Sequence, residues 1–257
     1  MDPQPLIWAK QLAVIAQNGL AYARDAYDRE RYTQLQALAA EMLVAGTDLD
    51  RVAVATLLAA DQGHATPKVG VRGVVFRDDA VLLVRERSDG RWTLPGGWSD
   101  AGESPAEGTV REVWEESGYR TRAVKLLALY DHSRHGHGSH LYTIYNAFFL
   151  CEIIGGEPSA TAIKTAQQAK PYRAGHFPHL TQARRRIQRV SRRLVRHRHG
   201  VDQSPVLLSA AGRHETDGVG FFSLDRLPEL SILRVTAIQI ARFFDHQRHP
   251  EWPTDFD

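Results

Sequence analysis

The spacing of apolar residues changes once along the chain, close to residue 67. Before that point apolar residues recur every three or four positions, which is typical of helices. The recurring positions of three expected helices are Leu6, Ala9, Leu12, Ala13 and Ala16; Tyr32, Leu35, Leu38, Ala39 and Met42; and Val52, Ala55, Leu58 and Ala59. Asp28 is expected to cap the second helix, and Thr47-Asp48 to precede the third. Residues 1–66 are therefore predicted to form a small all-α domain ending in the linker QGHATP.

From residue 69 onward the apolar pattern becomes that of β-strands. The expected strand segments are VGVRGVVF (69–76), AVLLVRE (80–86), RWTLPGG (91–97), KLLALYD (125–131), LYTIYNAFFLCEII (141–154) and GVGFFSL (218–224). A turn at Asp78-Asp79 makes the first two a hairpin. A closing helix is expected to bury one face made of Val235, Ile238, Ala241 and Phe244. Residues 67–257 are thus predicted to form a sheet flanked by helices, of the α/β class.

One helix is predicted between the strands at 91–97 and 125–131. Ser104 and Glu107 have the spacing of a capping box, Pro105 suits the first helical position, and Gly118 suits a left-handed stop. At about 100° per residue, one side of the helix is apolar and the other acidic. The acidic side carries Glu112, Glu115 and Glu116.

The three glutamates at this spacing repel one another. At ~5 Å and an effective dielectric of about 20, Coulomb's law gives about 3 kcal/mol for each pair in a cleft. A bound cation would remove this cost, and carboxylate oxygens without Cys or His suit Mg²⁺, with Mn²⁺ as a substitute. The alternative is a solvated acidic helix face, but it gives no reason for the positions of Gly97, Glu103 and Arg111.

Composition limits the class of protein. The chain has 257 residues and 43% hydrophobic content, enough for one large domain or two small ones. A single cysteine, Cys151, excludes an intramolecular disulfide and is expected to be a buried thiol in a reducing compartment. Because the first apolar stretch has no cationic leader and is interrupted by polar residues, we expect neither a signal peptide nor a membrane span, and the cytoplasm is the expected location.

The net charge of +2 hides a strong asymmetry. Residues 159–213 carry twelve Lys and Arg against one acid, Asp202, whereas the rest of the chain carries 20 basic and 29 acidic residues. Within this stretch apolar residues recur at helical spacing among arginines, as in a basic amphipathic helix. Its partner could be nucleic acid, an anionic membrane surface or the acidic remainder of the protein, or the stretch could be a loosely held excursion without function.

The stretch GWSDAGESPAEGTVREVWEESGY (97–119) resembles the Nudix box, and Tyr119 stands where that family usually has an aliphatic residue. With LPGGW, FFLCEIIGGE, ETDGVGFFSLDRLPELS and the N-terminal WAKQLAVIAQNGLAYARDAYDRERY, the chain resembles the Nudix hydrolases that carry a helical N-terminal domain. The resemblance implies an α/β/α sandwich around a mixed sheet (67–257), interrupted by a basic insertion at about 159–213. It also implies hydrolysis of a nucleoside diphosphate linked to another moiety, of the ADP-ribose or CDP-choline type. We expect the helical domain to pack on the catalytic domain or on a second subunit, and favour a homodimer.

The resemblance also implies roles for individual residues. The expected metal ligands are Glu112, Glu115, Glu116 and the carbonyl of Gly97. Glu103 would assist them, and Arg111 would orient a glutamate by a charged hydrogen bond. Glu215 matches the position of a further ligand or of the general base.

Three other interpretations stay open. The same box would serve a nucleoside triphosphate pyrophosphohydrolase that removes oxidised nucleotides. A non-catalytic regulator could use the basic insertion to bind nucleotide or nucleic acid. The histidines His132, His135, His137 and His140 could hold zinc, although a solvated Gly/Ser-rich loop near the substrate is the favoured interpretation.

Overall fold

The computed structural model describes residues 3–45, 50–137, 140–158 and 216–257. The chain divides into two compact units, one made of residues 1–68 with 139–144 and the other of residues 69–138 with 145–257. The expected basic insertion at 159–213, its predicted helix and Glu215 lie outside the described residues. In the described parts of the chain, no helix has the length and apolar character needed to cross a bilayer.

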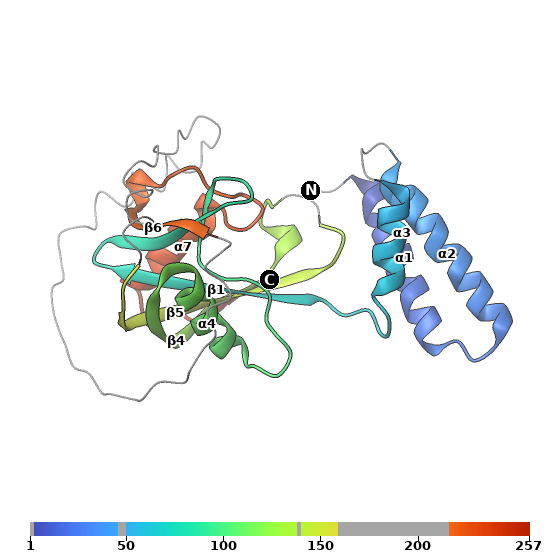
Figure 1. Ribbon diagram of the computed structural model, residues 1–257, viewed down its shortest axis with the longest axis horizontal. Helices are drawn as coiled ribbons and strands as arrows, with labels where there is room; N and C mark the ends of the chain where they lie inside the picture. Colours follow the sequence, from blue (N-terminus) through green and yellow to red (C-terminus); the bar gives the residue numbers. More distant parts are fainter. Residues whose placement is uncertain (1–2, 46–49, 138–139, 159–215) are drawn as a thin grey trace. The chain divides into compact units, whose positions relative to one another are not determined.

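The first unit contains the three predicted helices, α1 (Gln4–Tyr22), α2 (Ala26–Val44) and α3 (Arg51–Ala60) (Figure 1). Small and branched residues form its core, namely Ala9, Ala13, Ala39, Ala40, Leu43, Val54 and Leu58. The prediction that Asp28 caps α2 is wrong: Asp25 is the cap, and its carboxylate accepts the Asp28 N–H at 2.9 Å. Asp50 caps α3, while Thr47 and Asp48 lie outside the described residues.

The second unit is built on a seven-stranded mixed sheet. Its strands are β1 (Lys68–Arg77), β2 (Ala80–Glu86), β3 (Trp92–Thr93), β4 (Tyr119–Asp131), β5 (Ile144–Gly156), β6 (Thr216–Ser223) and β7 (Asp255–Phe256). The order is β3-β2-β1-β5-β4-β7, and β6 also pairs with β2. β4 and β7 pair in parallel, whereas β1 with β2, β2 with β3 and β4 with β5 are antiparallel.

The predicted strand at 91–97 is much shorter than expected. β3 ends at Thr93, and the following Pro95-Gly96-Gly97 bonds to β1 instead, since the Val71 N–H donates to the Gly97 carbonyl at 2.9 Å. The Gly73 N–H donates likewise to the Pro95 carbonyl at 2.8 Å. This stretch therefore runs beside β1 and leads directly to the glutamate-rich helix.

Two helices, α4 (Pro105–Ser117) and α7 (Ala237–Arg248), cover opposite faces of the sheet (Figure 1). Alternate residues of the strands supply the two cores, as strand geometry requires. Val74 and Leu83 pack with Phe243 of α7, whereas Val75 and Leu82 pack with the α4 side. The predicted α/β/α sandwich is thereby confirmed.

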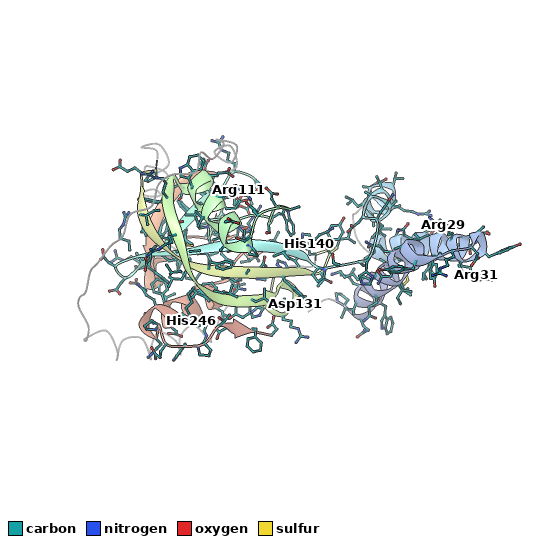
Figure 2. The ribbon with its side chains drawn as sticks, turned by 90° about the horizontal axis from the view of Figure 1, so that it is seen from below. Arg29, Arg31, Arg111, Asp131, His140 and His246 are labelled. Atoms are coloured by element: carbon teal, nitrogen blue, oxygen red, sulfur yellow. The ribbon has the colours of Figure 1, made fainter. Side chains whose placement is uncertain are left out.

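The predicted buried face of α7 is right only in part, because Val235 and Phe244 are buried, Ala241 is half-buried and Ile238 is exposed. Thr236 caps the helix with Gln239 in a capping box, so Val235 precedes the helix, and Ile238 is 57% exposed. The buried positions are Gln239, Ile240, Phe243, Phe244 and His246. Figure 2 shows Arg111 of α4 and His246 of α7 on opposite sides of the sheet.

Candidate active site

Helix α4 begins and ends where the sequence predicts. The Ser104 hydroxyl accepts the Glu107 N–H at 3.3 Å, and the Glu107 carboxylate accepts the Ser104 N–H at 2.8 Å, which completes the capping box. Gly118 ends the helix with a φ of +79°, and its N–H donates to the Trp114 carbonyl. Because both ends are fixed, the register of the glutamates on the helix is fixed too.

Arg111 gathers the carboxylates of the site around one guanidinium. It forms a two-point contact with Glu103, from Nη2 at 2.8 Å and from Nε at 3.1 Å. Its Nη1 donates to Glu112 at 2.9 Å and to Glu115 at 3.2 Å. These partners raise the pKa of Arg111, while Arg111 holds the pKa of Glu103 below its usual value. Arg111 therefore orients three carboxylates, more than the single one predicted.

Glu116 faces away from Arg111, toward the glycine-rich stretch. Its carboxylate accepts the Gly96 N–H at 2.8 Å. Burial raises the pKa of Glu116 well above its usual value, against the opposing effects of Arg72 and the Gly96 N–H. Burial also raises the pKa of Glu112. Because Glu115 and Glu116 are only 8% and 6% exposed, the interpretation as a solvated acidic face is wrong.

Two glycines let the backbone approach these carboxylates. Gly96 has a φ of +147°, and a Cβ there would lie 2.0 Å from the Val71 carbonyl oxygen. A Cβ on Gly97 would lie 2.7 Å from Oε1 of Glu112, so Gly97 and Glu112 are in close approach. Only glycine fits at position 96, whereas a side chain at position 97 would displace the Glu112 carboxylate.

Sequence reasoning missed Arg72 on β1. Its Nη1 donates to the Leu94 carbonyl at 3.2 Å and to the Gly96 carbonyl, beside Glu116. The signal available in the sequence was a lone arginine inside the apolar segment VGVRGVVF, which by itself reads as a side chain directed to solvent.

Known proteins with similar sequences place this site in a family. Residues 3–58 match a UDP-X-like N-terminal oligomerisation domain, and residues 66–170 match the NUDIX domain. YjhB of Bacillus subtilis, described as a putative ADP-ribose pyrophosphatase, is 36% identical over 249 residues, which make up 97% of this chain and 95% of that protein. The chain belongs to the Nudix family.

Solved Nudix structures agree with this assignment. The structure of an ADP-ribose pyrophosphatase from Streptococcus suis matches with a TM-score of 0.51 and 29% sequence identity. The match covers 75% of this chain and 100% of that one. A UDP-X diphosphatase structure has a TM-score of 0.51 and 25% identity, covering 98% of this chain and 97% of that one. The predicted family and the prediction of a hydrolase acting on pyrophosphate bonds are confirmed.

The donor chemistry of the Nudix helix fits a hard divalent cation. Its carboxylates are buried or half-buried, and burial raises the pKa of Glu112 and Glu116, so positive charge placed there is favourable. Among the described residues, however, no three acidic, His or Cys groups are arranged to hold an ion, because Arg111 engages Glu112 and Glu115 while Glu116 turns to Gly96. Cation binding therefore requires these side chains to turn.

Two further predicted positions have different outcomes. Glu215 lies outside the described residues, but the hydroxyl of its neighbour Thr216 donates to the Glu116 backbone carbonyl at 3.0 Å.

The histidine turn is less solvated than predicted. His132, in the short helix η1 (His132–Arg134), is buried and stacks on His137 at 4.3 Å between ring centroids. No zinc-binding group is formed by histidines of the described ranges.

Proposed function

We propose that this Nudix enzyme cleaves the diphosphate of a nucleoside diphosphate linked to another moiety, releasing a nucleoside monophosphate and a phosphorylated partner. The observation that carries the proposal is the set of buried and half-buried carboxylates that Arg111 gathers on α4 and in the loop before it. ADP-ribose is the first candidate substrate, because YjhB and the Streptococcus suis protein are described as ADP-ribose pyrophosphatases. UDP-linked compounds and CDP-choline are the next candidates, the former from the UDP-X diphosphatase.

The proposed cofactor is Mg²⁺, held by Glu112, Glu115, Glu116 and the Gly97 carbonyl. When bound, such an ion would neutralise charge on the diphosphate and would lower the pKa of a bound water. Arg111 holds Glu112 and Glu115 in register through hydrogen bonds, which would have to shift when an ion binds. Glu215 is the proposed further ligand or general base, and a positioned general base contributes about 10²- to 10⁴-fold.

A substrate panel tests the proposal. ADP-ribose, a UDP-sugar, CDP-choline and an oxidised deoxynucleoside triphosphate are incubated with Mg²⁺, Mn²⁺ or chelator, and the products are identified. In ¹⁸O-labelled water the label should appear in a phosphate, since water attacks phosphorus. Label in the sugar would refute the mechanism, and activity on the triphosphate alone would favour the triphosphate pyrophosphohydrolase.

Single substitutions test the carboxylates separately from the fold. Glu115→Gln and Glu116→Gln should each lower turnover by orders of magnitude while the protein stays folded, because each removes one charge from the cation site. Glu152→Gln is the matched control, since Glu152 forms an exposed ion pair with Arg122 at 2.7 Å. Turnover like that of the wild type in either active-site variant would contradict the assignment.

We also propose that a second copy of the chain covers the outer face of α1. Ala9, Ala13 and Ala16 fill the inner face of α1. Trp8, Ile15 and Tyr22, each seven residues apart, are 53%, 53% and 67% exposed and so form an unburied apolar stripe. The match of residues 3–58 to an oligomerisation domain supports a second copy as the partner.

Light scattering at several concentrations tests this homodimer. The wild-type chain should be dimeric, and Trp8→Ser combined with Ile15→Ser should shift it to monomer. Val124→Ser, at an exposed position of the other unit, should leave the mass unchanged. A double variant that keeps the wild-type mass would rule out this stripe as the interface.

The proposed location is the cytoplasm. Its support is the free, buried thiol of Cys151. Burial raises the pKa of this thiol to about 12, so Cys151 is an inert core residue of the kind found in reducing compartments.

A further inference from the structure

The guanidinium of Arg72 lies near Glu116 and forms hydrogen bonds through only one of its three nitrogens, Nη1. The side chain lies on the same face of β1 as Val74, which packs toward α7. Both of its hydrogen bonds leave from Nη1, to the Leu94 and Gly96 carbonyls. Its Nε is buried and has no hydrogen-bond partner among the described residues. The Nε–Nη2 edge is therefore held in place by the backbone, and the described part of the chain gives it no hydrogen-bond partner.

The buried, unpaired Nε of Arg72 is energetically costly. Burial lowers the pKa of Arg72, in keeping with a half-buried side chain whose Nε is fully buried. A buried donor without an acceptor loses its hydration without compensation, and the loss is larger for charged groups. The two parallel N–H groups of this edge are the pair that arginine uses to bind carboxylate or phosphate at two points.

The acids nearest to Arg72 are committed elsewhere. Glu116 has the largest favourable electrostatic effect on Arg72, followed by Glu86. The Gly96 peptide nevertheless lies between Arg72 and Glu116, donating its N–H to Glu116 and accepting from Arg72 at its carbonyl. Glu86 pairs with Arg234 at 3.2 Å. Arg72 is thus not simply the ion-pair partner of a buried glutamate.

The surroundings of Arg72 contain two more unpaired polar atoms. Nε2 of His137 and Nε2 of Gln239 are buried without hydrogen-bond partners among the described residues. Burial lowers the pKa of His137, the Arg72 charge acts in the same direction, and the neighbouring Gln239 side chain raises it, so Gln239 lies close to His137 even though neither Nε2 atom has a hydrogen-bond partner by distance and angle. Nε of Arg72 and Nε2 of Gln239 are both donors, and an acceptor oxygen is the group that each of them lacks among the described residues.

We propose that the Nε–Nη2 edge of Arg72 binds phosphate oxygens of the substrate's diphosphate, one peptide away from Glu116. The assignment rests on the proposed function for the identity of the ligand. Diphosphate oxygens can meet a divalent cation on the carboxylate side and a guanidinium on the other side of Gly96, and phosphate is the anion whose geometry matches this edge. The structure thereby adds to the site a substrate-binding residue that lies outside the Nudix box.

Calorimetry with imidodiphosphate and Mg²⁺ tests the contact on the full chain. This probe resists hydrolysis and carries no base or sugar, so it reports on the diphosphate alone. Arg72→Gln should weaken its binding about 10- to 100-fold, as expected for lost hydrogen bonds to a charged group. Arg72→Lys, which keeps the charge but lacks the two-point edge, should bind at least about threefold more weakly than the wild type. Arg77→Gln, on the same strand and packed over Phe221, should bind like the wild type.

The outcomes separate a binding role from a structural one. Folded Arg72→Gln that binds imidodiphosphate like the wild type would overturn the proposal. If Arg72→Gln does not fold, Arg72→Lys decides, and wild-type affinity there would show that Arg72 only offsets the charge of Glu116. If the wild type hydrolyses none of the nucleoside diphosphate compounds yet its imidodiphosphate binding depends on Arg72, the proposed function fails while the phosphate contact stands.

Discussion

One guanidinium, that of Arg111, restrains two acidic groups of the Nudix helix and a third acidic group in the loop before it. It contacts Glu103, Glu112 and Glu115 through charged hydrogen bonds, and Asp100 lies 3.4 Å away. Such contacts set the rotamers of the carboxylates and reduce their mutual repulsion. Arg111 is therefore expected to affect both the chemistry and the stability of the metal-free protein.

Arg111→Ala tests this double role. Turnover should fall about 10- to 100-fold, as is typical when a residue that orients metal ligands is removed. The melting temperature in chelator should also fall, because the carboxylates lose their shared counterion. Arg122→Ala, which breaks an exposed pair with Glu152, should change neither. Unchanged turnover, or unchanged stability in chelator, would contradict the role given to Arg111.

Residues of the site differ in how far the sequence predicts them. Glu112, Glu115 and Glu116 could be found because one helix fixes their spacing, and the capping signals of that helix are local. Arg72 could not, because its partners Leu94 and Gly96 follow it by 22 and 24 residues and reach it only through tertiary structure. The burial of His132 was missed for the same reason.

At the scale of elements, boundaries set by local chemistry were predicted and those set by packing were not. Ser104 and Gly118 delimit α4 as expected. The end of β3 depends on the bonding of residues 95–97 to β1, and the buried face of α7 depends on the sheet beneath it. A propensity pattern contains neither of these contacts.

Gly118→Ala tests how strictly the end of α4 is defined. Alanine would be strained at a φ of +79°, and its Cβ would lie 2.6 Å from the Glu157 carbonyl oxygen. Gly90→Ala is the matched control, with a φ of +67° and no atom within 4 Å of the added Cβ. We expect urea unfolding to show a loss for Gly118→Ala that exceeds the loss for Gly90→Ala by about 1–3 kcal/mol, the typical cost of overpacking. Equal losses would mean that the backbone near Glu157 yields easily.

At the scale of the whole catalytic unit, Asp255 on β7 joins the last residues of the chain to α7 and β4 through hydrogen bonds. Its carboxylate accepts from Arg242 and from His246 at 3.0 Å, both on α7, and from the Tyr130 hydroxyl on β4 at 3.1 Å. Arg242 is the largest cause of a lowered pKa at Asp255, and burial together with Asp255 raises the pKa of Tyr130. One carboxylate thus links the parallel strand pair to the helix that covers it.

The lowered pKa of Asp255 predicts a pH-dependent stability. A carboxyl group with a depressed folded-state pKa stabilises the protein above its unfolded value of 3.8 and loses that effect as the pH falls toward the folded-state pKa. Asp255→Asn should therefore cost about 1.5–3 kcal/mol at pH 7, in the range for hydrogen bonds to charged groups. The gap to the wild type should narrow below about pH 4.

Denaturant unfolding at pH 7 and at several acidic pH values measures that gap. Asp245→Asn is the control, since Asp245 pairs with Arg248 three residues away at 3.1 Å on the surface. A gap that stays constant through the acidic range would show that Asp255 acts through shape rather than charge.

Side chains along β2 point alternately to the two faces of the sheet, and this limits how far the length of the strand can change. Leu82 and Leu83 are adjacent in sequence, yet one packs on the α4 side of the sheet and the other on the α7 side. A one-residue insertion in the middle of β2 would exchange these assignments for the rest of the strand, which pairs with both β3 and β6. Both hydrophobic layers would then lose their fit at once, so β2 should tolerate substitutions at single positions far better than any change in its length.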